Sequence, residues 1–131
     1  VAVATEKGLT VPNVYGADTL TLAEIAVRRR DIAERARSGG LKMDDVTGGT
    51  FTISNLGMMG IDRFDAILNV PQAAILAVGS TRQRQVWRDD GPVWLPIAEF
   101  TLTCDHRALD GAAAARFLTT LAGVIAAPLV A

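Results

Sequence analysis

Residues 72–80 read QAAILAVGS, a run that is continuously apolar from Ala73 to Val78 rather than alternating with polar residues. A strand that is buried on both faces reads in this way, whereas a strand with one solvated face alternates. Pro71 precedes the run and Gly79 follows the last valine, so both ends carry turn signals. The stretch therefore predicts a buried strand in a sheet that is covered on both faces.

Further strands are predicted on both sides of this run. Residues 48–55, GGTFTISN, are rich in β-branched side chains. Downstream, RQVW (84–87) and VWLPIAEFTLTC (93–104) are separated by the turn sequence RDDGP, which predicts a hairpin. Upstream, residues 1–5 and 9–14 read as extended segments on either side of Gly8.

Two helices are expected at the flanks of these strands. In residues 21–38, Thr21 and Glu24 form a capping-box pattern, and Gly39 and Gly40 end the helix. Its apolar stripe comprises Leu22, Ile25, Ala26, Ile32, Ala33 and Ala36. The charges on its outer face, from Arg28 to Arg35, favour a solvated face with spaced ion pairs over an anion site.

The second expected helix follows Asp110, which is a suitable N-cap residue for GAAAARFLTTLAGVIAA. Phe117, Leu121 and Val124 repeat in it at helical spacing, and Pro128 ends it. The predicted fold class is α/β (α+β), with strands dominating the centre and helices at the flanks.

The composition excludes several classes of function. The 131 residues carry a formal charge of -1 with both signs interspersed, so we expect neither nucleic acid nor a membrane surface as partner. One cysteine and one histidine leave no ligands for a zinc cluster, so no metal is expected. Half of the residues are hydrophobic, which indicates surface buried against other subunits.

His106 is the only histidine, and residues 106–111 read H-x-x-x-D-G with Asp110 as the acid. It lies between a predicted strand and a helix cap, where rigid elements can hold a side chain at a pocket rim. An imidazole there can act as general base. A lone histidine is also often a structural residue, and position alone leaves that alternative open.

Ser54 ends the predicted strand 48–55 and precedes the glycine-punctuated loop LGMMGIDRF. A hydroxyl in this position suits the stabilisation of a developing oxyanion. The alternative is a serine that satisfies its local backbone. Together, the Ser54 segment and the His106 motif favour a chemical role.

The two segments, TFTISNLGMMGIDRFDAILNVPQAAILAVGS and DHRALDGAAAARFL, closely resemble the C-terminal catalytic domain of the dihydrolipoamide acyltransferases. These are the E2 components of 2-oxo acid dehydrogenase complexes. The H-x-x-x-D-G motif alone would also fit chloramphenicol acetyltransferase and its relatives. The serine segment resembles the pyruvate dehydrogenase branch most.

The resemblance implies that His106 takes the proton from the attacking thiol of coenzyme A or dihydrolipoamide. A thiol has an ordinary pKa of about 8.5 and imidazole one of about 6.5, so the transfer is feasible once they are aligned. Ser54 would stabilise the oxyanion. Asp110 would cap the helix or orient the imidazole, with Asp105 and Arg107 as scaffolding.

The resemblance further implies an acyl pocket that is lined by Phe64, where a ring would favour acetyl over branched acyl groups. Met58 and Met59 would line the same cavity, although a methionine is more often a core filler. Coenzyme A would be a substrate. The lipoyl group would be carried on a separate domain, with no metal.

The resemblance implies a chloramphenicol acetyltransferase-like fold, a mixed sheet flanked by helices. It also implies a homotrimer in which Ser54 and His106 of different chains cooperate. Trimers would assemble into a cubic or icosahedral core and would meet the E1 and E3 components through other domains. Residues 1–131 are then expected to be part of one catalytic domain, without its N-terminal portion and without lipoyl or subunit-binding domains. The implied location is the bacterial cytoplasm or the mitochondrial matrix. A non-catalytic core scaffold of the same fold is the alternative, and an antibiotic acetyltransferase ranks last.

Overall fold

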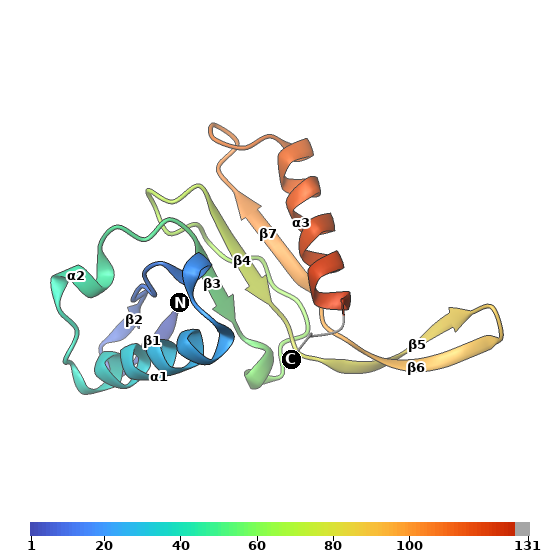
Figure 1. The fold of residues 1–131 in the computed structure, drawn as a ribbon, viewed down its shortest axis with the longest axis horizontal. Helices are drawn as coiled ribbons and strands as arrows, with labels where there is room; N and C mark the ends of the chain where they lie inside the picture. The colour runs from blue at the N-terminus through green and yellow to red at the C-terminus, as the bar shows by residue number, and fades with distance from the viewer. Residues whose placement is uncertain (128–131) are drawn as a thin grey trace.

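A computed structural model describes residues 1–127. Its centre is a three-stranded sheet with the order β3 (Thr52–Asn55), β4 (Ala74–Val78) and β7 (Phe100–Cys104) (Figure 1). Strand β3 runs parallel to β4, and β7 runs antiparallel to it. The sheet is therefore mixed, as the family resemblance implies.

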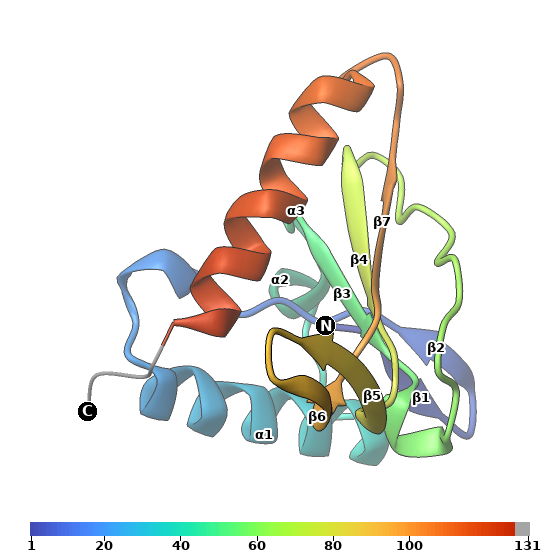
Figure 2. The same cartoon turned by 90° about the vertical axis from the view of Figure 1, so that its right-hand side faces the viewer.

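Strand β4 is the buried middle strand. Its residues Ala74, Ile75, Leu76 and Ala77 are each 5% exposed or less. Helix α3 (Gly111–Ala126) lies over one face of the sheet, and the irregular segment before β4 runs along the other (Figure 2). The prediction of a strand covered on both faces is confirmed.

The N-terminal part forms a second small core. Strands β1 (Val3–Thr5) and β2 (Gly8–Thr10) form an antiparallel hairpin against which α1 (Leu22–Ser38) packs. Val3, Ala33 and Ala36 are buried against one another in this core. The Ala2 amide donates to the Ile53 carbonyl at 3.1 Å, which joins this part to β3. Two short helices complete it, η1 (Ala17–Thr19) and α2 (Met43–Val46).

Helix α1 begins and ends where the sequence predicts. Thr21 and Glu24 form the capping box, and Gly39 ends the helix in the left-handed conformation at φ 76°. Of the predicted stripe, Leu22 is 70% exposed, because the first turn extends beyond the hairpin that covers the later turns. Arg35 pairs with Asp31 at 2.9 Å, as expected for a face with ion pairs.

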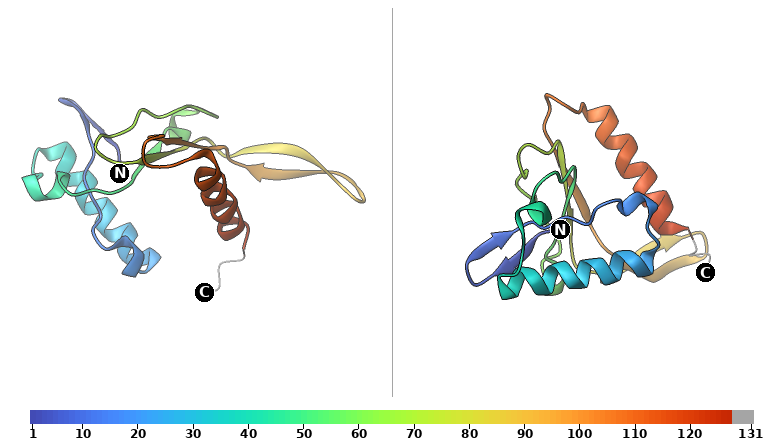
Figure 3. Two further views of the ribbon diagram at one scale, coloured as in Figure 1. Left: turned by 90° about the horizontal axis from the view of Figure 1, so that it is seen from above. Right: turned by 60° about the vertical axis from the view of Figure 1, so that its left-hand side comes forward.

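Strands β5 (Arg82–Arg88) and β6 (Gly91–Ile97) form an antiparallel hairpin that projects away from the rest of the chain (Figures 1 and 3). The register pairs Gln85 with Trp94 and Trp87 with Pro92. Because side chains alternate along a strand, Trp87 and Trp94 lie on one face of the hairpin. They are 79% and 65% exposed.

The predicted extent of the second arm of this hairpin is wrong. The second arm, read from the sequence as one strand over 93–104, is two strands in two sheets. Strand β6 ends at Ile97, and β7 begins at Phe100 beside β4. The physical reason is that residues 100–104 find a buried partner strand in β4, whereas β6 pairs only with β5.

Helix α3 begins at the predicted cap. The Asp110 side chain accepts a hydrogen bond from the Ala113 amide at 2.7 Å. The helix packs through part of its predicted stripe, since Phe117 lies against Phe51 whereas Val124 is 68% exposed. The predicted stop at Pro128 lies outside the described residues.

Candidate active site

Ser54 lies near the end of β3, where it pairs with Ala77 of the buried strand. The side chain is partly exposed, and its hydroxyl makes no hydrogen bond with residues 1–127. The alternative, in which the Ser54 hydroxyl hydrogen-bonds to its local backbone, is therefore not observed within these residues. Ser54 offers a free donor at the edge of a rigid sheet.

The chain turns directly after β3 into the short helix η2 (Gly57–Met59). The Asn55 carboxamide accepts from the Gly57 amide at 2.8 Å, and the Leu56 amide donates to the Val78 carbonyl at 3.2 Å. Met58 and Met59 are 86% and 73% exposed. The alternative that they fill the core is wrong, and both thioethers are available to a ligand or to another chain.

The sequence reasoning missed the pair that ties this loop to the hairpin. The guanidinium of Arg82 donates to the Asp62 carboxylate at 2.8 Å and to the Gly60 carbonyl at 3.2 Å. The guanidinium holds the pKa of Asp62 below its ordinary value. No local signal predicts this pair, because the two residues are separated by the whole of β4.

His106 lies in a tight turn between β7 and α3. The Asp105 amide donates to the Ala73 carbonyl at 2.9 Å, and the Leu109 amide donates to the Asp105 carbonyl at 3.0 Å. The imidazole is exposed and makes no hydrogen bond within the described residues. A side chain on a turn fixed in this way can meet a substrate that approaches from outside the chain.

The charged neighbours of His106 are engaged elsewhere. Arg107 pairs with Asp105, with a shortest distance of 2.6 Å, and its guanidinium lowers the pKa of Asp105 to about 2. Asp110 caps α3 through the Ala113 amide. The carboxylates therefore shape the turn, and among the described contacts Asp110 accepts no hydrogen bond from the imidazole.

Ser54 and His106 lie at opposite ends of the sheet. Ser54 is level with Ala77 and Thr101, whereas His106 follows Cys104, which pairs with Ala74 at the other end of β4. With ~3.3 Å per residue and ~4.8 Å between strands, the backbones of Ser54 and Cys104 are roughly 14 Å apart, and His106 is two residues farther on. One chain does not bring the two side chains together.

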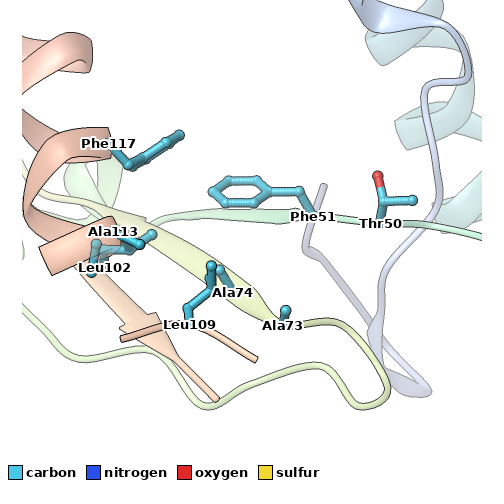
Figure 4. Close-up of a pocket in the computed structure, with 9 residues that line it drawn as sticks. Thr50, Phe51, Ala73, Ala74, Leu102, Leu109, Ala113 and Phe117 are labelled. Carbon is cyan, nitrogen blue, oxygen red and sulfur yellow. The ribbon is translucent and has the colours of Figure 1, made fainter. Parts of the chain in front are cut away.

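Phe64 lies half-buried in the irregular segment between η2 and β4. A separate apolar pocket of about 220 Å³ opens between α3 and the sheet (Figure 4). Phe51 and Phe117, whose rings form a tilted aromatic pair with centroids 5.7 Å apart, line it together with Leu102 and Leu109. Neither Ser54 nor His106 lines this pocket, so the apolar cavity and the candidate site are distinct.

In residues 1–127, no group of three or more histidine, cysteine, aspartate or glutamate side chains could hold a metal ion. No helix in that range has the length and apolar character needed to cross a membrane.

The chain matches the family described as 2-oxoacid dehydrogenases acyltransferase (catalytic domain) over residues 1–131. It belongs to this family. A relative from Schizosaccharomyces pombe, the mitochondrial dihydrolipoyllysine-residue acetyltransferase component of pyruvate dehydrogenase complex, is 48% identical over 131 residues. The corresponding component from Zymomonas mobilis is 42% identical over 129 residues. The match covers 98% of this chain but only 27% and 29% of those proteins.

Solved structures of the family share the fold. The dihydrolipoamide acetyltransferase of Azotobacter vinelandii superimposes with a TM-score of 0.92 at 39% identity. The cubic core of a pyruvate dehydrogenase multienzyme complex gives the same TM-score at 38% identity. Each match covers 95% of this chain and 51% of the other. The predicted family and fold class are confirmed.

The Azotobacter protein was studied for the role of a serine, a histidine and an asparagine in its catalytic mechanism. In its numbering the histidine follows the serine by 52 positions, and the asparagine follows the histidine by four. Ser54, His106 and Asp110 have the same two separations, with aspartate in the third place.

Proposed function

We propose that this chain transfers an acetyl group between dihydrolipoamide and coenzyme A as part of the core of a pyruvate dehydrogenase complex. The observation that carries the proposal is the shared spacing of Ser54, His106 and Asp110 with the three residues studied in the Azotobacter acetyltransferase. The curated relatives carry the same activity in their names. Because these relatives include bacterial and mitochondrial proteins, the proposed location of this chain is a bacterial cytoplasm or a mitochondrial matrix.

His106 acts as the general base in this proposal. Its imidazole takes the proton from the attacking thiol, whose sulfur forms a new bond to the carbonyl carbon of the acyl thioester. The exposed position of the imidazole supports this role, since the thiol belongs to a substrate that comes from outside. The protonated imidazole then returns the proton to the departing thiolate as the old carbon–sulfur bond breaks.

Ser54 stabilises the tetrahedral intermediate between those two steps. Its hydroxyl donates to the oxyanion, and the absence of a competing hydrogen bond among residues 1–127 leaves it free to do so. Removing one such donor typically lowers kcat by about 10²–10³-fold. No covalent acyl-enzyme is needed, because the two sulfurs exchange the acyl group directly.

The site is completed by a second copy of the chain in a homotrimer. Ser54 and His106 flank opposite ends of the sheet, so a tetrahedral centre that contacts both requires Ser54 of one protomer and His106 of its neighbour. The projecting hairpin supports this arrangement. Trp87 and Trp94 expose a large apolar area there, which soluble proteins ordinarily cover at an interface.

The acyl group binds beside η2. Met58 and Met59 offer exposed apolar side chains directly after β3, and Phe64 follows in the same segment. A ring at Phe64 shortens the cavity, which favours acetyl over branched acyl groups by a modest factor per methylene.

Mixed oligomers test the proposal. His106→Ala and Ser54→Ala chains with different affinity tags are each expected to be inactive in acetyl transfer from acetyl coenzyme A to dihydrolipoamide. When the two are co-expressed, roughly one quarter of the interfaces in a random trimer pair an intact serine with an intact histidine. Activity should therefore return to roughly that fraction of the wild-type value.

Three results would each contradict part of the proposed function. Undiminished transfer by His106→Ala would remove the imidazole from the mechanism. Inactive mixed oligomers beside active wild type would place both residues in one protomer. Assembly of the wild type without any transfer would favour the non-catalytic scaffold.

A further inference from the structure

We infer that Arg82 is a positioning residue for the acyl site, because it fastens the loop that carries Met58 and Met59 to the base of the β5–β6 hairpin. This inference rests on the proposed function. It assigns a role to a residue outside the serine and histidine motifs, and it predicts an effect on the binding of the acyl donor rather than on proton transfer.

The contacts of Arg82 carry the inference. Its side chain donates from Nε to the Asp62 carboxylate at 2.8 Å and from Nη2 to the Gly60 carbonyl at 3.2 Å. Gly60 ends η2, the turn that holds the two exposed methionines. One guanidinium thus contacts a backbone carbonyl and a side chain of the same loop, which fixes the loop more closely than a single ion pair does.

The loop is also packed directly onto the start of the hairpin. The Ser80 amide donates to the Ile61 carbonyl at 2.8 Å. A Cβ atom placed on Gly57 would lie 2.5 Å from the Gly79 carbonyl oxygen, so only glycine allows this approach. These backbone contacts set where the loop begins and ends, and Arg82 fixes the turn between them.

Because the Arg82–Asp62 ion pair is exposed, its effect on the position of the loop can be told apart from an effect on folding stability. The Arg82 and Asp62 side chains are 52% and 48% exposed, and an ion pair of that exposure contributes little to folding stability. A displaced turn, in contrast, changes the shape of the acyl site directly. Small displacements of substrate-positioning groups can cost on the order of 10²-fold in rate.

The test compares Arg82→Ala with Arg84→Ala in the assembled protein. Arg84 lies on the same strand and pairs with Glu99 at 2.6 Å, but it has no hydrogen bond to the loop among the described residues, which makes it the matched control. Arg82→Ala should raise the KM for acetyl-dihydrolipoamide about tenfold, with an unchanged pH profile of kcat. Arg82→Lys should recover part of the loss, since it keeps the charge beside Asp62.

Hydrogen exchange gives a second readout that does not depend on turnover. The amides of Gly60 and Ile61, which close the turn, should exchange faster in Arg82→Ala and in Asp62→Ala but not in Arg84→Ala. The double variant Arg82→Ala/Asp62→Ala should behave like Arg82→Ala, whereas Asp62→Ala alone should have a smaller effect, because it leaves the hydrogen bond from Arg82 to the Gly60 carbonyl in place.

Each outcome separates the inference from the function on which it rests. An active wild type whose Arg82→Ala variant matches Arg84→Ala in both KM and exchange overturns the inference alone. A parallel loss of kcat with a shifted pH profile also overturns it, since that result assigns Arg82 to proton transfer. A wild type without transfer activity overturns the proposed function and the role in acyl binding together.

Discussion

Replacing Asp110 tests whether this residue of the His106 motif acts through the helix or through the imidazole. The carboxylate accepts from the Ala113 amide at 2.7 Å, and the first turn of α3 contains no other acidic side chain. Gly111 and the alanines after it offer no substitute cap. Asp110→Ala therefore leaves the amide groups of the first turn without a side-chain acceptor.

The expected loss of folding stability in Asp110→Ala is the sum of two contributions. Loss of an N-cap acceptor costs about 1 kcal/mol, and loss of a negative charge beside the helix N-terminus costs about 0.3–1 kcal/mol more. A total of about 1–2 kcal/mol corresponds to roughly 3–8 °C in Tm for a chain of this size. Asp110→Asn keeps the acceptor, so it should lose only the smaller charge contribution.

The assay is thermal unfolding by circular dichroism at one fixed protein concentration, together with acetyl transfer at 25 °C. Asp110→Asn should retain most of the transfer activity. Glu34→Ala, on the exposed face of α1, is the control and should shift stability by less than about 0.5 kcal/mol. An inactive Asp110→Asn variant with wild-type Tm would refute the reasoning, because it would require the aspartate charge at the imidazole.

Three further outcomes are expected. Arg107→Ala should raise the pKa of Asp105 from about 2 toward 3.8, as measured by carboxyl NMR titration, and an unchanged pKa would contradict the pairing. In the wild type, the stability that the pair contributes is full above about pH 4 and is lost as the pH falls toward 2. Phe64→Ala should raise transfer of branched acyl groups relative to acetyl by roughly tenfold in competition assays, and an unchanged ratio would remove the ring from the acyl pocket. Trp94→Ala should shift the oligomer toward smaller species in sedimentation velocity, whereas Arg88→Ala, on the opposite face of the hairpin, should not; equal behaviour of the two would place the interface elsewhere.

Local patterns predict much of this fold because they report local physics. The capping box at Thr21, the stop at Gly39 and the cap at Asp110 each depend on groups within four residues. The continuous apolar run in β4 reports burial on both faces, which any covered middle strand requires. These elements are therefore confirmed with nearly the predicted bounds.

What the sequence does not predict depends on pairing between distant segments. The break between Ile97 and Phe100 separates two sheets, yet the residues on both sides favour strands equally well. The link between Asp62 and Arg82 crosses the whole of β4 and has no sequence signature. In the candidate site, residue types and spacing identify Ser54 and His106, but only the strand register shows that they lie at opposite ends of one sheet.

The turn that carries His106 is fixed at Asp105 to Ala73, directly before β4, and at Asp110 to α3. The backbone of this turn needs no ordering when substrate arrives, so for the proposed general base part of the entropic cost of assembling the reactive geometry has been met during folding. Heating should then inactivate the protein when the proposed trimer dissociates or when the sheet melts, with no loss of activity before either event.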